Sequence, residues 1–321
     1  MTELILPPVA SLATLEATVA EADAYHAQAR AEATLRAYRA DWRTFEQWCS
    51  ARQFSSLPAT PETVALYITE MARSRKVSTI TRHLASIAQA HKEKKHESPT
   101  RAAVVQNVLK GIRRAKGTAP TQKAAAEITV IRAMVAALSP TLQGVRDRAI
   151  LLLGFAGAFR RSELASLTLS DMQFTNDGLV ITLRHSKTDQ ADEGYIKGIP
   201  YGSTPATCPV RALRGWLDAS DITAGPLFRS VWKGGRQLRP SPLGDRAIAE
   251  VVKRAAQAAG YDPARFSGHS LRAGLVTTAA AAGVDERTIM EQTGHKTTTM
   301  VRRYMRRGSL FRNNAAAKVG L

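Results

Sequence analysis

One short segment, KGTAPTQKAA at residues 116–125, divides this 321-residue chain into two parts with different patterns. The segment combines glycine, proline, threonine and lysine and lacks apolar anchors, which is typical of a linker. Little period-2 alternation occurs before residue 175, so no sheet is expected in the first third of the chain. We therefore expect two domains, of which the first is helical.

Four segments of the first part have the apolar periodicity of helices. They are residues 31–51, the stretch from Thr60 to Met71, residues 78–92 and residues 101–116. Thr60 is a candidate helix cap, and Pro61 suits the first turn that follows it. The pattern predicts a helical domain at 29–116 and a linker at 117–125, and leaves residues 1–28 unassigned.

The second part, residues 126–321, mixes helices with a small sheet. Helices are expected at 127–137, 143–157, 209–219, 244–258, 269–282, 285–292 and 297–305. The stretch GLVITLRHSK at 178–187 alternates and is rich in β-branched residues, and YIKGIP at 195–200 follows it, which predicts a hairpin. The expected fold class is mainly α with a small antiparallel sheet, an α domain joined to an α+β domain.

The charge balance points to an anionic partner. The chain has 45 Lys and Arg against 27 Asp and Glu, a formal net charge of +18, and nucleic acid is the commonest partner of such a chain. No apolar stretch approaches the roughly 18–20 residues that span a bilayer, and the N-terminus lacks a signal-peptide pattern. Two cysteines are too few for a disulfide framework or a cysteine-rich metal site. These features favour a cytoplasmic DNA- or RNA-binding protein that does not enter a membrane.

The stretch FSGHSLRAG at 266–274 begins like the G-x-S-x-G elbow of serine hydrolases. Arg272 replaces the final glycine, and a loop precedes the serine where the elbow needs a strand. If a helix begins near Ser270, His269 and Arg272 lie about one turn apart and can face one small anion. The arginine fork suits phosphate, whereas an ordinary helix start with an exposed histidine is the alternative.

Three other stretches carry residues that suit phosphate chemistry. Arg160 follows a buried apolar helix, where an arginine is costly unless it meets an anion or a carboxylate such as Glu163; a purely structural Arg–Glu pair is the alternative. Lys187 falls at the hairpin tip, where lysine often serves solubility alone. His295 follows a glycine turn, and Tyr304 lies nine residues later among arginines, although a half-buried tyrosine is ordinary.

The order Arg, Lys, His-x-x-Arg, His, Tyr from residue 160 to residue 304 resembles the tyrosine recombinases, also called the phage integrase family. The matching pieces are FRRSEL, SKT, GHSLRAG and TGHKTTTMVRRYM. The stretches TPETVALYITEM and KVSTITRHLASIAQAHK are similar to the helical core-binding domain of Cre-like members. The resemblance implies that the two domains form a C-shaped clamp around double-stranded DNA, with the linker crossing the duplex.

The resemblance also implies a role for each matching residue. Tyr304 would attack the scissile phosphate, forming a 3′-phosphotyrosine and freeing a 5′-hydroxyl. Arg160 and Arg272 would hold the non-bridging oxygens, Lys187 would be the general acid for the leaving oxygen, and His269 would act as base or proton carrier for the tyrosine.

The two remaining members of the catalytic set would support these groups. The resemblance implies that His295 hydrogen-bonds a phosphate oxygen and that Glu163 orients His269 or Arg160. Fixed cations would do the work of a metal, and the covalent intermediate would keep the energy of the phosphodiester. No metal and no other cofactor is therefore expected.

Candidate DNA contacts lie in both domains. They are Arg36, Arg39, Thr79, Arg82, His83, Lys233, Arg236 and Arg246. The helix that carries Thr79, Arg82 and His83 is the candidate for reading the major groove, and Arg246, at a helix start after SPLGD, resembles a guanine-reading arginine of Cre-like proteins. Phosphate contact is the expectation for the basic set as a whole, and a solvated surface charge is the alternative for each member.

The C-terminal segment SLFRNNAAAKVGL at 309–321 carries apolar residues beyond the tyrosine. In this family such a segment docks into a neighbouring subunit, which implies a homotetramer on two DNA sites, with packing in cis as the alternative. We thus expect a site-specific recombinase of bacterial, phage or plasmid origin. A type IB topoisomerase and a non-catalytic DNA-binding protein are the alternative functions.

Overall fold

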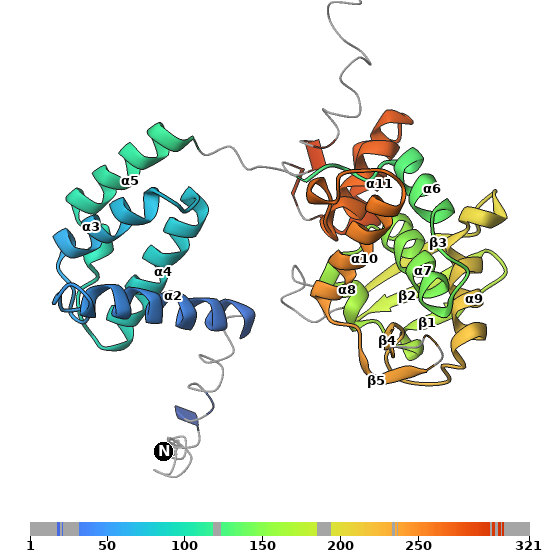
Figure 1. Ribbon diagram of the computed structural model, residues 1–321, viewed down its shortest axis with the longest axis horizontal. Coiled ribbons are helices and arrows are strands. Elements are labelled where there is room, and N and C mark those ends of the chain that lie inside the picture. The colour runs from blue at the N-terminus through green and yellow to red at the C-terminus, as the bar shows by residue number, and fades with distance from the viewer. Residues whose placement is uncertain are drawn as a thin grey trace, which may run out of the picture. The chain divides into compact units, whose positions relative to one another are not determined.

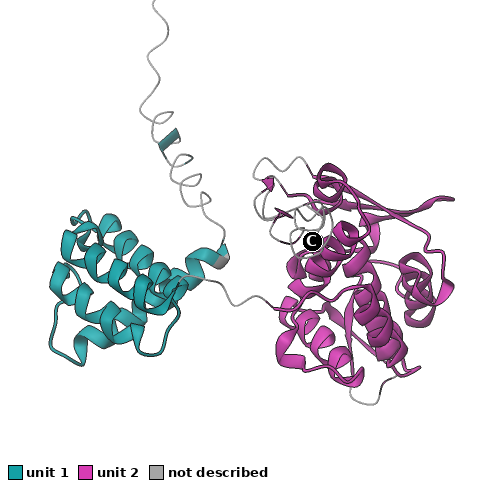
Figure 2. Cartoon of the chain, turned by 90° about the horizontal axis from the view of Figure 1, so that it is seen from above, with its two compact units in different colours: residues 1–121 teal, residues 122–321 magenta. Residues whose placement is uncertain are grey.

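The protein divides into two compact units, residues 1–121 and 122–321 (Figures 1 and 2). This computed structural model describes residues 32–117, 123–184, 194–232 and 237–295, together with residues 18, 19, 21, 235, 297, 298, 301, 302 and 304. Each unit has its own hydrophobic core. Within these residues, no helix is both long and apolar enough to cross a membrane.

The first unit is a bundle of helices. Its described elements are α2 (Glu32–Ser50), α3 (Pro61–Ala72), α4 (Val77–Glu93), the 3-10 turn η1 (Pro99–Arg101) and α5 (Ala103–Lys116). Thr60 caps α3 as the sequence predicts, since its hydroxyl oxygen accepts the Thr63 N–H at 3.2 Å. Phe45, Ile68 and Ile80 from α2, α3 and α4 are fully buried against one another, so an apolar face of each helix forms the core.

The second unit surrounds a small sheet with helices (Figure 1). Its helices are α6 (Ile128–Ala136), α7 (Leu142–Ala156), α8 (Arg161–Ser166), α9 (Pro209–Ser220), α10 (Asp245–Ala258), α11 (His269–Ala281) and α12 (Glu286–Thr293). Its 3-10 turns are η2 (Leu169–Asp171), η3 (Pro205–Thr207) and η4 (Pro263–Arg265). The expectation of a mainly helical fold with small antiparallel sheets is confirmed.

The sheets are more extensive than the expected hairpin. The strands β2 (Gly178–Leu183) and β3 (Tyr195–Pro200) pair antiparallel, and β1 (Met172–Phe174) adds a third strand to them. A second sheet pairs β4 (Arg229–Val231) with β5 (Leu238–Pro242). The sequence did not indicate these extra strands, because three residues are too few to show alternation and the two prolines in LRPSP argue against a strand.

Helix α7 leads directly into the segment that carries Arg160. It is buried along most of its length and packs on α9 and α11. After it ends at Ala156, the chain turns sharply through Ala158, whose φ of +48° lies in the left-handed region that costs a non-glycine residue energy. Ala158 and Phe159 are fully buried, so the core holds this turn in place and aims the following residue, Arg160.

Helix α11 is attached to the segment that enters the second unit. The Ala126 N–H donates to the Ser270 carbonyl at 2.9 Å. Gly274, one turn along α11, lies directly against the backbone of Ala126, since a Cβ there would come within 2.0 Å of the Ala126 carbonyl oxygen. This close approach fixes the N-terminal turn of α11, where His269 and Arg272 lie.

Candidate active site

Arg160 and Glu163 form one unit at the start of α8. Glu163 Oε2 accepts the backbone N–H of Arg160 at 2.8 Å, and its Oε1 accepts a hydrogen bond from Arg160 Nη1 at 2.5 Å. The side chain of Glu163 is 4% exposed and that of Arg160 is 20% exposed. Glu163 therefore fixes both the backbone and the guanidinium of Arg160, which is one of the two contacts expected for it.

Arg272 is a buried cation on α11. The residue is 2% exposed, and its Nη1 donates to the Ala158 carbonyl at 2.7 Å. Its Nη2 is buried and has no hydrogen-bond partner within the described part of the chain. Burial, reinforced by the charge of Arg160, lowers the pKa of Arg272 from 12.5 to about 10. A buried guanidinium with an unused donor is costly unless an anion occupies the place it faces.

His269 and Tyr304 contact each other directly. The Nε2 atom of His269 lies 2.8 Å from the Tyr304 hydroxyl. Partial desolvation and the cations Arg272 and Arg160 lower the pKa of His269 below its usual 6.5, so the ring is neutral at pH 7. A neutral Nε2 without a proton can accept the tyrosine proton, as a general base must.

Packing holds Tyr304 at this place. Tyr304 is 6% exposed, and it belongs to a small apolar cluster with the fully buried Val301 and with residues of α11 and α12. On the same helical stretch, Arg302 Nε donates to both carboxylate oxygens of Glu286 at 3.0 and 3.1 Å. This packing holds the tyrosine hydroxyl beside His269.

His295 lies just beyond α12 and is oriented by a threonine. The Thr293 hydroxyl oxygen lies 2.7 Å from His295 Nδ1. Burial and the cations Arg272 and Arg160 lower the pKa of His295 to about 3, so this ring is also neutral. Because the Thr293 hydroxyl donates its own proton to the Ile289 carbonyl at 2.8 Å, its oxygen accepts from His295 Nδ1–H, and Nε2 of the neutral ring is then an acceptor. Sequence reasoning missed Thr293, because its role depends on the turn that folds it back onto the histidine.

Lys197 on β3 was also missed. It is 3% exposed, and its Nζ donates to the carbonyls of Gly157, at 2.9 Å, and Gln292. The rings of Phe159 and Tyr195 lie 5.3 and 5.2 Å from Nζ. A lysine beside isoleucine in a short strand suggests a solvent-facing side chain, yet Ile196 is the exposed residue of the pair.

These residues form one electrostatic unit, here named the basic cluster. Its members are Arg160, Lys197, His269, Arg272 and His295, with Glu163 as the carboxylate among them. Arg160 contributes to the lowered pKa of each of the other four, so all of them are close enough to repel. Mutual repulsion in a buried setting is relieved by a bound anion, and a phosphodiester with two non-bridging oxygens suits the arginine forks.

The other residues of the hydrolase-like stretch are structural. Ser270 is 1% exposed, and its hydroxyl oxygen accepts the Ser267 N–H at 3.0 Å, so it is a helix-start residue. Three expected site residues, Lys187, Lys233 and Arg236, lie outside the described residues.

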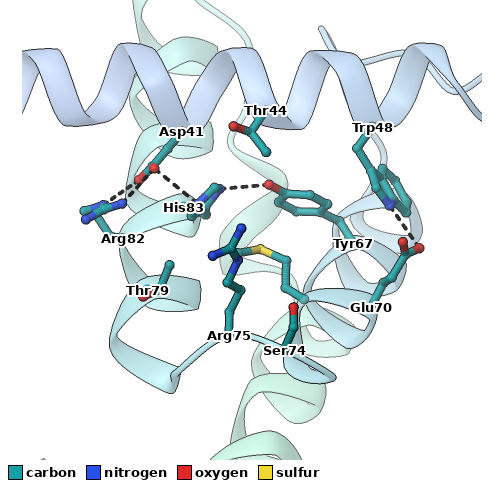
Figure 3. A pocket seen from close by; sticks show the side chains of 11 residues that line it. Asp41, Thr44, Trp48, Tyr67, Glu70, Ser74, Arg75, Thr79, Arg82 and His83 are labelled. Atoms are coloured by element: carbon teal, nitrogen blue, oxygen red, sulfur yellow. Dashed lines mark hydrogen bonds and ion pairs between the residues drawn. The ribbon is translucent and has the colours of Figure 1, made fainter. Parts of the chain in front are cut away.

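A hollow between the helices of the first unit holds three of the candidate DNA contacts (Figure 3). It has a volume of about 360 Å³, and Thr79, Arg82 and His83 line it. Asp41 binds Arg82 in a bidentate pair at 2.6 and 2.9 Å, which leaves the guanidinium about half exposed and fixed in direction.

His83 has a different place from the one expected. It is 6% exposed; its Nδ1 lies 2.8 Å from the Tyr67 hydroxyl and its Nε2 lies 3.2 Å from Asp41. Because both ring nitrogens are engaged, we no longer expect His83 to contact a base, and we assign it to holding Asp41 under Arg82.

The remaining described candidates are exposed. Arg36 and Arg39 lie on α2, where Arg36 pairs with Glu32 at 2.7 Å. Arg246 is the second residue of α10. Their exposure makes all three accessible to a DNA phosphate.

Comparison with known proteins shows the family of this chain. A sequence profile described as the phage integrase family matches residues 127–309, more than half of the chain. The chain belongs to this family. Among its relatives, the Integrase/recombinase xerD homolog of Selenomonas ruminantium is 39% identical over 292 residues, which cover 90% of this chain and 85% of the relative. Recombinase cre of Escherichia phage P1 is 28% identical, and the match covers 87% and 85% of the two chains.

Two solved structures share the fold of this chain. A lambda integrase (75–356) dimer bound to a COC′ core site aligns with a TM-score of 0.58 at 17% identity and covers 89% of this chain and 92% of its own. XerH site-specific recombinase bound to palindromic difH substrate, in a post-cleavage complex, aligns with a TM-score of 0.57 at 16% identity and covers 81% and 71%. The profile match and the 39% identical relative confirm the family resemblance seen in the sequence.

Proposed function

We propose that this protein is a site-specific DNA recombinase, which cuts and rejoins DNA strands through a 3′-phosphotyrosine intermediate. The observation that carries the proposal is the 2.8 Å contact between Tyr304 and His269 beside the buried cation Arg272. The names of the relatives, an integrase/recombinase and a recombinase, support it.

The basic cluster binds the scissile phosphate. Arg272 gives the buried Nη2 donor to one non-bridging oxygen, while Nη1 stays on the Ala158 carbonyl. Arg160, held by Glu163, contributes a second fork, and we assign His295 to a phosphate oxygen in accordance with the family resemblance. These donors are in place before the reaction, so they stabilise the added negative charge of the pentacoordinate transition state without reorganisation.

Tyr304 then attacks phosphorus. Its proton passes to His269 Nε2, because a free tyrosine has a pKa of about 10 and needs a base at neutral pH. The Tyr304 oxygen–phosphorus bond forms as the phosphorus–O5′ bond breaks, and the leaving oxygen takes a proton to become a 5′-hydroxyl. We assign that proton to Lys187, in accordance with the family resemblance.

Rejoining is the reverse of cleavage with another strand. A 5′-hydroxyl from the partner strand attacks the phosphotyrosine, the bond between phosphorus and Tyr304 breaks, and the tyrosine recovers its proton. One phosphodiester is exchanged for another, so the reaction consumes no external energy source.

The two units divide the work of recognition. We assign DNA binding outside the active site to residues 29–116, and cleavage to residues 126–321, joined by the linker at 117–125. Arg82, fixed by Asp41 and partly exposed, is the strongest candidate for a contact in the first unit. We further propose a homotetramer on two DNA sites in the cytoplasm of a bacterial cell.

A trapped covalent adduct tests the proposal. Duplex fragments from the neighbourhood of the gene, nicked close to the cleavage position, lose the short strand that carries the 5′-hydroxyl and so cannot be resealed. The wild-type chain should give a protein–DNA band on a denaturing gel, and Tyr304→Phe should give none. An absent wild-type band would leave a non-catalytic DNA-binding protein, and an adduct with Tyr304→Phe would refute the assignment of the nucleophile.

A type IB topoisomerase has nearly the same chemistry and is separated by its product. It relaxes supercoiled plasmid without a partner strand. We expect this protein to leave a plasmid without its cognate site supercoiled and to yield recombinant product from a plasmid that carries two sites. Efficient relaxation of the site-free plasmid would favour the topoisomerase.

A further inference from the structure

Lys197 is the one member of the basic cluster to which the proposed reaction gives no task. It lies in the middle of β3, and its ammonium group joins three segments that are distant in sequence. One hydrogen bond goes to Gly157, in the turn after α7, and the other goes to Gln292, near the end of α12.

Both acceptors stand next to catalytic groups. Gly157 precedes Ala158, whose carbonyl holds Arg272 Nη1 at 2.7 Å. Gln292 precedes Thr293, whose hydroxyl contacts His295 at 2.7 Å. Lys197 is therefore linked to the guanidinium of Arg272 and to the imidazole of His295. Each link consists of a hydrogen bond from Lys197 to a carbonyl, one step along the backbone and a second hydrogen bond.

We infer that Lys197 is a positioning residue of the strand-cleavage site: it holds the turn that orients Arg272 and the helix end that orients His295, and adds its charge behind the phosphate-binding groups. This inference rests on the proposed function. Lys197 contacts no reacting group itself, since its described partners are carbonyls and rings.

A residue that only connected β3 to the turn after α7 and to the end of α12 would not need to be charged. The side-chain amide of Gln292 already links the same segments, because its Nε2 donates to the carbonyls of Ala156 at 2.8 Å and Gly198 at 3.5 Å. A buried ammonium beside Arg272 is an expensive way to repeat that connection. Its cost is offset once an anion enters the basic cluster, so the lysine is matched to the phosphate-bound state.

The charge state of Lys197 is sensitive to pH. Burial, and next the positive charge of Arg272, lower its pKa from 10.5 to about 7. The carboxylate of Glu163 raises this pKa, and the charge of Arg160 lowers it further. The uncharged rings of Phe159 and Tyr195 lie against the ammonium group, and the neutral His295 is within its electrostatic reach. Without DNA, Lys197 therefore loses its proton as the pH rises through neutrality, and a bound phosphate shifts this loss to higher pH.

Lys197→Met and Lys197→Arg separate charge from shape. Single-turnover adduct formation on the nicked duplex should be at least tenfold slower in Lys197→Met at pH 7 and largely restored in Lys197→Arg. Binding without cleavage, measured by gel shift in a Tyr304→Phe background, should change less than twofold. The matched control is Lys253→Met, which removes a partly exposed lysine of α10 that pairs with Glu250 in the same unit and should cleave at the wild-type rate.

The pH profile decides the matter even if Lys197→Met does not fold. The wild-type rate should fall on the alkaline side as Lys197 loses its proton, and this fall should move to higher pH in Lys197→Arg, because arginine stays charged. Superimposable profiles of the wild type and Lys197→Arg would overturn the inference, as would a wild-type rate in a folded Lys197→Met. Either result leaves the proposed function intact, since that depends on the Tyr304→Phe adduct test.

Discussion

Arg272→Met should make the protein more stable while it abolishes most of the activity. The lowering of the Arg272 pKa from 12.5 to about 10 means that its surroundings oppose the charge by about 3 kcal/mol. The hydrogen bond to Ala158 acts in the other direction, with a net value of about 1–2 kcal/mol. Methionine fills a similar volume without charge, so the free energy of unfolding should rise by about 1–2 kcal/mol.

Calorimetry of the full chain measures this effect. For a unit of this size, the expected gain raises the Tm of the second unit by about 2–8 °C. Adduct formation should fall by about 10²–10³-fold, the usual loss for one oxyanion donor. Arg246→Met, at an exposed arginine of the same unit, should leave the Tm unchanged. A Tm of Arg272→Met that lies more than a few degrees below that of the wild type would show that the guanidinium stabilises the fold, which would refute a net electrostatic penalty at this position.

Three further predictions follow from other contacts. Thr293→Val removes the hydroxyl that orients His295 at 2.7 Å, so adduct formation should slow about tenfold, the equivalent of one lost hydrogen bond, with unchanged DNA affinity in a gel shift; a wild-type rate would contradict it. Because the folded state holds the pKa of His295 near 3, below the 6.5 of the unfolded chain, stability is full above about pH 6.5 and should fall by about 1–2 kcal/mol between pH 7 and pH 5, as measured by urea unfolding. His295→Asn should reduce that loss, and an equal loss would assign it to other groups. Gly274→Ala places a Cβ 2.0 Å from a carbonyl oxygen, so thermal unfolding should show a destabilisation of about 1–3 kcal/mol or more, and an unchanged Tm would mean that the backbone adjusts freely.

The helices could be predicted from the sequence because they carry strong local signals. Thr60 caps α3, and the apolar run of α7 marks a buried helix, so each could be recognised without knowing its neighbours. The strands β4 and β5 could not, since their pairing comes from contacts between short polar segments rather than from alternation.

In the candidate site too, some residues could be predicted from local sequence and others only from the fold. Residues such as Arg272 and Tyr304 could be named because their types and order carry the chemistry. Lys197 and Thr293 act through a carbonyl and a ring nitrogen that folding brings to them. His83 is the opposite case. Its residue type and its helix suggest a DNA contact, whereas a buried aspartate and a tyrosine hydroxyl engage its ring in the structure.

The contact between His269 and Tyr304 within one chain has a consequence for an assembly of identical subunits. If each subunit uses its own Tyr304 with its own His269, a subunit with Tyr304→Phe and another with Arg272→Met cannot repair each other by exchanging these residues. If only some subunits of a tetramer cut at one time, the inactive subunits contain the same catalytic residues. Their inactivity then has to come from a different position of those residues. The order of strand exchange would then depend on the geometry of each subunit, since all subunits have the same sequence.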